Sequence, residues 1–504
     1  MSRATTSAGG MGSVARGGAF ALAGSVVSAV MGLLLVVVLG RTLGTAGAGV
    51  VFQAIAAFTI AMSLARFGLD TTAVWLLPRL RTEAPHLMRA AVVRLLAPAF
   101  AMGVLGAGAL LLLSRLVGAD NDLLADSLVG MAWALPLAGV ALVGLAATRA
   151  LGGVRTFVTV QNIAIPTARP VLAWAVTLAG GGAVAVAVSW VAPLPLAAGV
   201  ALLILARQLR RVLGDTEDLG SPEPGASLNR RIWGYTAPRA VSAVLEESMR
   251  WLDVLLVGLL AGPSAAGLYG AATRFTNAGM ILSTSLRIVV APMYSRHLGA
   301  KDLRAADGLY SVTTIWIIAF SVPIYLVLAL FGGSMIGLLG QDFREGAPAL
   351  GILAGGMAMV LTAGNIQSVL LMSGYSSLAA LNKLAAVAVN VTLLFLLVPP
   401  LGIVGAALAW VAGMVVDTVL AITQVHRKVG VRPLPRAVLA VLATTVLTFG
   451  TPALILRLSI GDTVTAMLSG AALGVVCLVI VMWRAPRLFQ LADLASIITA
   501  RKGT

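Results

Sequence analysis

Four charged side chains stand in one apolar stretch of the chain, residues 244–256, which reads VLEESMRWLDVLL. They are Glu246, Glu247, Arg250 and Asp253. Three of them, with Arg239 upstream, recur at intervals of seven, four and three residues and so share one face of a helix, whereas Glu247 lies about 100° away. Such a face could bind a ligand or a coupling ion. Alternatively, it could form a Glu246–Arg250–Asp253 ion network that only holds helices together.

Basic loops on either side require this charged stretch to cross a membrane. The segments 207–231 and 296–304 are both rich in Lys and Arg, so two crossings must fit between them, and 232–260 must be one. Each ionised side chain in such a crossing costs ~2.5–3.5 kcal/mol on insertion scales, so these charges should face water or one another.

Other charged residues also fall inside predicted spans, where they are rare and costly. They are Arg66, Arg169, Arg274 and Asp417. Arg169 lies between Pro166 and Pro170, and two prolines four residues apart are expected to break the helix there. Arg66 can pair with Asp70 one turn later. Asp417 could hold a proton or cation, or it could be a hydrogen-bonded structural residue.

The elements that carry these charges are long apolar helices. The 504 residues are 59% hydrophobic and 11% charged, with a mean hydropathy of +0.99. We therefore predict an all-α, polytopic membrane protein with fourteen spans. They are 17–39, 48–77, 88–114, 127–148, 157–179, 183–206, 232–260, 267–291, 310–332, 347–372, 378–398, 403–425, 435–457 and 463–483. The net charge of +16 does not indicate a nucleic-acid partner, because the Lys and Arg residues lie between apolar segments.

The Lys and Arg residues alternate between the predicted loops. One alternate set of loops and termini, to which Lys383 is assigned, holds 25 of the 35 cations, and the intervening loops hold four. Cationic loops stay in the cytoplasm, so both termini are predicted to be cytoplasmic. The first span lacks a convincing cleavage site and is expected to remain in the multi-pass membrane protein.

The chain resembles itself at an offset of about 220 residues. GTAGAGVVFQA at 44–54 aligns with GPSAAGLYGAA at 262–272, and GVRTFVTVQN at 153–162 aligns with GYSSLAALNK at 374–383. An even number of spans separates each pair, so the repeat is parallel and predicts two pseudo-symmetric six-helix lobes plus two C-terminal helices. The predicted divisions are 1–206 for the first lobe, 207–231 for a cytoplasmic linker, 232–427 for the second lobe, and 428–504 for the last two helices and a cytoplasmic tail.

Three motifs carry a resemblance to a known family. RTLGTAGAG at 41–49 follows the first span, FGLDTTAVWLLPRL at 67–80 closes the second, and GPSAAGLYGAATR opens the second lobe. They resemble motifs of bacterial polysaccharide flippases, the Wzx-like branch of the multidrug/oligosaccharidyl-lipid/polysaccharide exporter superfamily. The resemblance implies a transporter of the bacterial inner membrane, not an enzyme. It would carry undecaprenyl-pyrophosphate-linked oligosaccharide from the cytoplasmic to the outer leaflet for cell-surface polysaccharide biosynthesis.

That implied substrate gives the intramembrane charges an expected role. Arginine presents several permanently charged donors to phosphate oxygens. The expected substrate-binding cations are Arg66, Arg169, Arg250 and Arg274, and the expected charge-compensating or coupling acids are Glu246, Glu247, Asp253 and Asp417. Alternating access would proceed by rocking of the lobes, and a proton or cation could bias it. Membrane lipids are the other expected partner, and neither a cofactor nor a metal site is expected.

Other functions stay open at this point. A lipid II flippase would share fourteen spans, but its family has arginines in the first span, and this chain has none there after Arg16. A multidrug or cation antiporter would use cavity carboxylates, and the first span has none. A membrane-embedded glycan polymerase would need a sizeable external loop, whereas the longest predicted ones, 114–126 and 333–346, are short.

Overall fold

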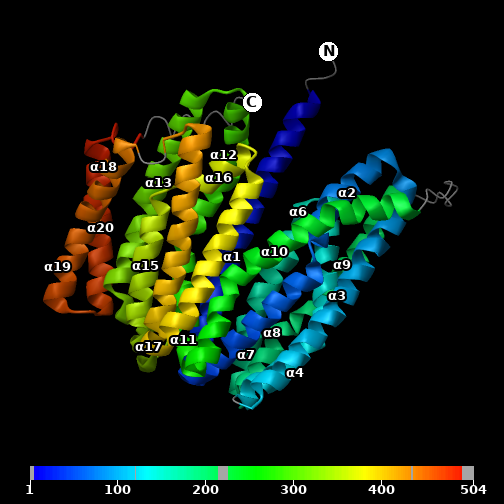
Figure 1. Cartoon of the computed structure of the whole chain (residues 1–504), viewed down its shortest axis with the longest axis horizontal. Coiled ribbons are helices and arrows are strands. Elements are labelled where there is room, and N and C mark those ends of the chain that lie inside the picture. The colour runs from blue at the N-terminus through cyan, green and yellow to red at the C-terminus, as the bar shows by residue number, and fades with distance from the viewer. Residues whose placement is uncertain (1–4, 120, 214–224, 433–434, 491–504) are drawn as a thin grey trace. The chain divides into compact units, whose positions relative to one another are not determined.

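The computed structural model describes residues 5–119, 121–213, 225–432 and 435–490. This described part of the chain is built from helices and contains no strand (Figure 1). It divides into two compact units, Met1–Gly258 and Leu259–Thr504. The all-α class predicted from the sequence is therefore confirmed.

The first unit contains one very long kinked helix, several straight ones and a π-helical turn. Its elements are α1 (Thr5–Arg66), α2 (Leu69–Glu83), η1 (Pro85–Leu87), α3 (Met88–Val117), α4 (Asp122–Ala132), α5 (Leu135–Gly152), α6 (Val154–Phe157), η2 (Val158–Ala164), α7 (Ile165–Leu178), α8 (Ala183–Val191), α9 (Pro193–Leu213) and α10 (Gly225–Ala261). Buried leucines of α2 pack with α3, α5 and α9, and Leu228 and Ile232 of α10 complete the same core.

The second unit is assembled around α13. Its elements are α11 (Pro263–Ala278), α12 (Ile281–Gly299), α13 (Leu303–Leu330), α14 (Gly332–Gly337), η3 (Gln341–Gly346), α15 (Ala347–Leu361), α16 (Ile366–Met372), α17 (Ser376–Gln424), η4 (Val425–Val429), α18 (Arg436–Thr445), η5 (Val446–Gly450), α19 (Thr451–Ile460) and α20 (Val464–Arg484). Ile315, Ile317 and Ile318 of α13 are fully buried, so this helix forms the interior of the unit.

The two aligned copies of the repeat motif also have the same backbone conformation at their first glycine. α1 is two helices that meet at a kink at Gly44, which has φ 67° and ψ −171°. Gly262, its aligned partner before α11, has φ 87° and ψ 171°. A Cβ atom would clash in this region of backbone space, so glycine is required at both positions. The two copies of the motif therefore make the same helix-to-helix junction.

The antiparallel contact of α2 with α10 ties the charged helix α10 to the first unit. The Thr72 and Thr236 hydroxyl oxygens lie 2.8 Å apart in a buried contact between the helices. Nearby, a Cβ added to Gly68 would come within 3.1 Å of the Ala240 nitrogen. The unit boundary at Gly258 lies near the C-terminal end of α10, whereas the lobe boundary inferred from the repeat, at 232, lies near its N-terminal end.

The repeat-based divisions at 206, 231 and 427 remain predictions. Residues 214–224 of the predicted linker and 491–504 of the predicted tail lie outside the described residues.

The helix that carries Arg169 passes through both prolines without breaking. A π-helical turn, η2, runs directly into α7, and Pro166 falls in the first turn of α7. Proline lacks the N–H that would donate to the preceding turn, and the wider π turn before Pro166 takes up an extra residue so that the helix continues. The break predicted between Pro166 and Pro170 is therefore wrong.

Two predicted spans of the second unit are interrupted, and buried tyrosines of α13 bind the interruptions. The Tyr325 hydroxyl donates to the Thr276 carbonyl (2.8 Å), beside the break between α11 and α12. The Tyr310 hydroxyl donates to the Ala363 carbonyl (2.6 Å), in the break between α15 and α16. A carbonyl released from a helix inside a membrane needs such a donor, because no lipid group can supply one.

Several helices are long and apolar enough to cross a membrane. Within the described ranges there are eight, or nine if the pair Gln341–Leu361 and Ile366–Met372, bent by 47°, is one span. Two of the eight, Phe20–Glu83 and Ser376–Val429, have 64 and 54 residues. At ~1.5 Å per residue each is far longer than the ~30 Å hydrocarbon core. The chain is therefore a multi-pass membrane protein, and the number fourteen stays a prediction.

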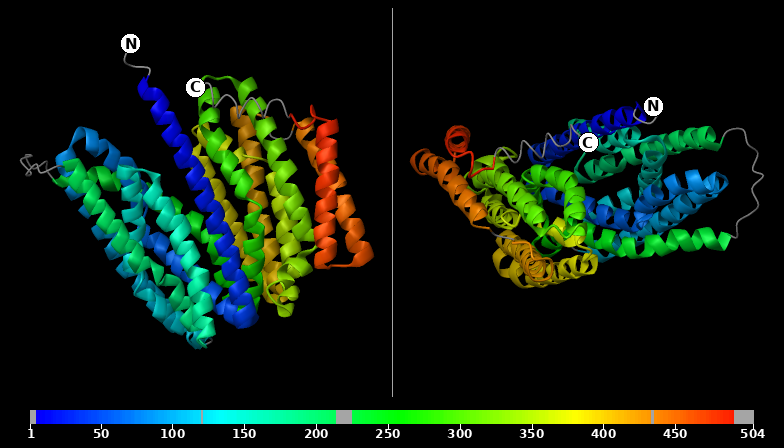
Figure 2. Two further views of the ribbon diagram at one scale, coloured as in Figure 1. Left: turned by 180° about the vertical axis from the view of Figure 1, so that it is seen from behind. Right: turned by 90° about the horizontal axis from the view of Figure 1, so that it is seen from above.

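The C-terminal hairpin is held to the rest of its unit by Asp462. The two arms of the hairpin, α19 and α20, run side by side (Figure 2). Asp462 in the turn accepts backbone N–H groups from Gly333 and Ser334 (both 3.0 Å) and lies 3.3 Å from Arg457 Nη1. Partial burial disfavours ionisation, but the hydrogen bonds from Ser334 and the charge of Arg457 outweigh it and hold the pKa of Asp462 below its ordinary value.

Replacing Gly44 by alanine tests the junction in the repeat. Gly44→Ala meets no neighbouring atom within 4 Å, so its cost is the conformational strain alone, ~1–3 kcal/mol. Gly32 of α1 also has free space around it, and Gly32→Ala should be neutral or stabilising, because alanine has the higher helix propensity. Thermal unfolding in detergent measures both. Equal midpoints for the two variants would contradict the strained junction.

Asp462→Asn should lower the midpoint of thermal unfolding at pH 7. A carboxyl whose pKa is depressed by folding stabilises the fold above its unfolded pKa of ~3.9, and loses that contribution as pH falls through the folded pKa. The difference between wild type and variant should therefore shrink below about pH 4. Asp342→Asn, at an exposed carboxylate of η3, is the matched control. A difference that is constant with pH would contradict the electrostatic contribution.

Candidate functional site

The break between α1 and α2 places Arg66 between two carboxylates. Arg66 ends α1, and its Nη1 lies 3.7 Å from Asp70 Oδ2 in the first turn of α2. Its Nη2 lies 3.6 Å from Glu247 Oε2 of α10, and Glu247 Oε1 accepts a 3.0 Å hydrogen bond from Trp251 Nε1. The cluster of Arg66, Asp70 and Glu247 thus has one more carboxylate than guanidinium groups.

The other charges of α10 do not form the Glu246–Arg250–Asp253 network. Glu246 is 53% exposed and pairs with Arg239, with 3.6 Å between Oε1 and Nη1. Arg250 is exposed and makes no ion pair with any residue that the structure describes. Asp253 is buried at 2% exposure, and its Oδ1 lies 2.9 Å from the backbone N–H of Val254. The face predicted from the spacing therefore carries charges in three different environments.

Arg169 has an aromatic partner and no acidic one. Its Nε donates a 3.3 Å hydrogen bond to the Trp190 carbonyl of α8, and its Cζ lies 3.4 Å from the centre of the Trp190 ring. Phe58 and Trp190 form a T-shaped pair, with 5.9 Å between the ring centres. Across residues 5–490, apart from the few positions that the structure leaves undescribed, no carboxylate lies within 4 Å of this guanidinium. The Arg169 guanidinium is thus held against an aromatic face.

Asp417 of the second unit has a cationic partner, Lys383, which the sequence did not indicate. Its buried Oδ2 lies 2.5 Å from Lys383 Nζ, and its Oδ1 has no hydrogen-bond partner in the part of the chain that the structure describes. One helical half of α17 carries Lys383 and the other carries Asp417, with a kink at Gly402 between them. Asn382 and Gln424 exchange two hydrogen bonds, of 2.9 and 2.8 Å, across the same pair of segments.

Sequence reasoning missed Lys383 as a partner for Asp417. It is among the 25 cations assigned to cytoplasmic loops, but it lies inside α17, which begins at Ser376. Its position inside the predicted span 378–398 was the one sign in the sequence that it lies within a helix.

Arg274 is half-buried in α11 of the second unit. The structure therefore joins Arg66 to Glu247, and places Arg274 and Asp417 in the other unit.

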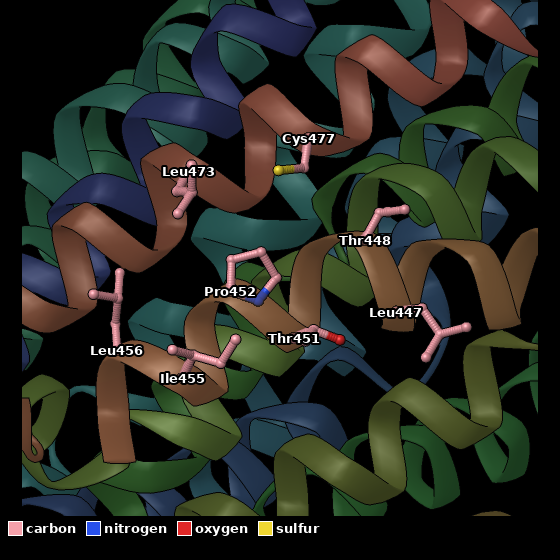
Figure 3. Close-up of a pocket in the computed structure, with 8 residues that line it drawn as sticks. All are labelled: Leu447, Thr448, Thr451, Pro452, Ile455, Leu456, Leu473 and Cys477. Carbon is pink, nitrogen blue, oxygen red and sulfur yellow. The ribbon is translucent and has the colours of Figure 1, made fainter. Parts of the chain in front are cut away.

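An open groove of about 480 Å³ lies along the C-terminal hairpin (Figure 3). Leu447, Pro452 and Ile455 line one side of it, and Leu473 and Cys477 of α20 line the other. The lining contains no ionisable acid or base that could bind phosphate, so this groove is separate in chemistry from the charged sites.

Two family models match the sequence. The model described as polysaccharide biosynthesis protein matches residues 14–298, and the model MatE matches residues 238–404.

Two curated relatives come from Haloferax volcanii. A probable low-salt glycan biosynthesis flippase is 26% identical over 206 residues, which cover 39% of this chain and 42% of that protein. A probable flippase is 26% identical over 202 residues, covering 38% of this chain and 39% of that protein. The chain thus spans about two fifths of the length of the curated relatives it matches.

Solved transporter structures share the fold. The lipid II flippase MurJ in an inward closed conformation superposes with a TM-score of 0.70 at 11% identity, over 92% of this chain and 98% of that one. An inward-facing multidrug resistance MATE family transporter of the MOP superfamily gives 0.62 at 13% identity, over 80% and 95%. At these identities the likeness concerns the fold alone.

Removing one partner of the Lys383–Asp417 pair should destabilise the protein more than neutralising both. Lys383→Met leaves a carboxylate that is 2% exposed without its cation, and breaking a buried pair in this way costs ~3–5 kcal/mol. The double variant Lys383→Met/Asp417→Asn leaves no net charge and should recover most of that loss. Thermal unfolding in detergent measures both. A double variant as unstable as the single one would contradict this role of charge.

Proposed function

The chain belongs to the polysaccharide biosynthesis protein family, as its motifs predicted, and from that premise we propose that it moves a lipid-linked oligosaccharide across the membrane. The observation that carries the proposal is Arg169, a cation of α7 in the predicted span 157–179 that has no acidic partner in the described chain. A charge kept at that depth is costly, and such residues usually serve ligands.

A pyrophosphate-linked glycan supplies the anionic partner that Arg169 lacks among the described residues. The pyrophosphate is a multiply charged anion that cannot cross bare hydrocarbon, and guanidinium groups bind phosphate oxygens through several directed donors. The Trp190 ring packs against the Arg169 guanidinium, and the Trp190 carbonyl accepts a hydrogen bond from Arg169 Nε. That arrangement orients the side chain and leaves its terminal nitrogens for the anion.

The other intramembrane charges take supporting roles in the proposal. Arg66, Arg250 and Arg274 are further cations for phosphate or sugar oxygens. Glu246, Glu247, Asp253 and Asp417 compensate arginine charge when no substrate is bound, or take up a coupling proton or cation. The cluster around Arg66 supports this, because its extra carboxylate gives a proton or cation a place to bind.

We further propose the cellular setting. The protein lies in the bacterial inner membrane with both termini in the cytoplasm, and it carries undecaprenyl-pyrophosphate-linked oligosaccharide outward by alternating access, without catalysing a covalent step. The excess of Lys and Arg on alternate loops supports this orientation. A peptidoglycan precursor is the alternative substrate, because the fold, which is shared with a lipid II flippase over 92% of the chain, is compatible with either lipid.

Deleting the gene and measuring lipid-linked glycan in the outer leaflet of spheroplasts tests the function. We expect the glycan to accumulate in the inner leaflet and surface polysaccharide to fall, while peptidoglycan synthesis continues. Arrested peptidoglycan synthesis would instead support the alternative substrate. Unchanged translocation of both lipids would overturn the proposal.

Arg169→Ala should weaken transport of the lipid-linked glycan by at least about tenfold, because a hydrogen bond to a charged group contributes ~1.5–3 kcal/mol. Arg169→Lys should recover only part, since lysine lacks the planar set of donors. Arg210→Ala, at an exposed arginine near the end of α9, is the matched control and should transport normally. Membrane insertion is measured for each variant. Normal transport by an inserted Arg169→Ala protein would remove Arg169 from the binding site.

A further inference from the structure

An aromatic and cationic cluster lies at the end of the α2–α10 pair, away from the charges discussed so far. The rings of Trp75 (α2) and Tyr235 (α10) are stacked, with centres 4.6 Å apart and planes within 6° of parallel. The Arg79 guanidinium carbon lies 4.5 Å from the centre of the Trp75 ring. Arg231 pairs with Glu83 across the same two helices, with 3.1 Å between Nη2 and Oε2. Trp75, Arg79, Arg231 and Tyr235 are called the Trp–Tyr cluster below.

The Trp–Tyr cluster packs on buried residues of α2 on one side and is exposed on the other. Leu76 and Leu80 of α2 are fully buried next to it, and the Thr72–Thr236 contact fixes the two helices one turn away. Tyr235 is nevertheless 38% exposed, and Arg79 is exposed. The stack on Trp75 therefore sets the orientation of a tyrosine ring that remains accessible.

The charges of the cluster favour an oxygen-rich or anionic ligand. Arg79 has no carboxylate within 4 Å in the part of the chain that the structure describes, whereas Arg231 has one. A flat aromatic surface beside a guanidinium with free donors matches a pyranose. The C–H face of a sugar packs on the electron-rich face of a ring, and its hydroxyls accept hydrogen bonds from the guanidinium.

Aromatic residues at a membrane surface more often serve only as interfacial anchors, and Trp233 shows the contrast. Trp233 is also 38% exposed, yet it lies two residues before Tyr235 and so about 200° around α10. It contacts Phe67 edge to face, with ring centres 6.2 Å apart, and among the described residues no cation lies over its ring. An anchor needs only this arrangement, whereas the Trp–Tyr cluster adds a parallel stack and an arginine without an acidic partner.

We propose that the Trp–Tyr cluster is a saccharide-binding subsite. Tyr235 contacts the sugar, Arg79 donates to its hydroxyl or phosphate oxygens, and Trp75 positions both. The proposal rests on the proposed function, because it assigns the cluster to the glycan of the lipid-linked substrate. Arg79 and Arg231 belong to the basic segments 79–94 and 207–231, which are predicted to be cytoplasmic, so this would be the side on which the substrate is first met.

The test compares two probes with the full chain in phosphatidylcholine nanodiscs. One is geranylgeranyl pyrophosphate, and the other is the same lipid carrying N-acetylglucosamine on the pyrophosphate. Tyr235→Ala should weaken binding of the sugar-bearing probe by about tenfold, as expected for loss of an aromatic contact and the packing around it. Binding of the sugar-free probe should change less than about twofold. Tyr235→Phe keeps the ring and should bind both probes like wild type.

Matched variants separate a sugar contact from loss of structure. Trp233→Ala removes an equally exposed aromatic residue from another side of α10 and should leave binding of both probes unchanged. Tyr235→Leu keeps apolar bulk and folding while removing the flat ring, and should bind like Tyr235→Ala. Thermal unfolding confirms that each variant is folded.

The outcomes are distinct. A Tyr235→Ala protein that binds the sugar-bearing probe like wild type overturns the subsite, and so does an equal loss for both probes or an equal effect of Trp233→Ala. If wild type binds neither probe, the proposed function fails as well. Wild-type binding with unaffected Tyr235 variants removes only the saccharide subsite.

Discussion

The close antiparallel contact of α2 with α10 is the interaction on which the first unit depends. Lipid offers no hydrophobic driving force between helices, so association relies on close packing and on hydrogen bonds between small polar residues. Gly68 lets the backbones approach, and the Thr72–Thr236 pair supplies the hydrogen bond. This contact brings Glu247 to Arg66 and stacks Tyr235 on Trp75. Residues without functional chemistry of their own thus set the positions of the charged and aromatic groups.

Ionised groups inside hydrocarbon need partners, and the two units meet this need differently. In the second unit, Lys383 and Asp417 neutralise each other within one kinked helix. In the first unit the balance is left incomplete: Arg169 lies against Trp190 with no acidic partner among the described residues, and the cluster around Arg66 has an extra carboxylate. Incomplete compensation costs stability, so its retention fits a unit that exchanges charge with a substrate, as we propose.

The similarity to known transporters is most extensive in the fold, which does not identify the substrate. The fold matches a lipid II flippase over nearly the whole chain at 11% identity, so it reports helix arrangement and not the substrate. The polysaccharide biosynthesis model covers residues 14–298, which include the incompletely compensated charges of the first unit, Arg66, Arg169 and Glu247. The region that the family model matches therefore contains the charges on which the proposed function rests.

Sequence alone determined the helical class, the membrane setting, the family and the repeat, because apolar runs, loop charges and glycine junctions are local properties of the chain. It also identified Arg169, Glu247 and Asp417 as costly charges, since any ionised residue in an apolar span is unusual. Tertiary structure alone decided their partners. Trp190 meets Arg169 and Lys383 meets Asp417, and α10 packs with the first unit through Ile232. These outcomes depend on which helix faces approach each other, and periodicity within one helix carries no information about its neighbour.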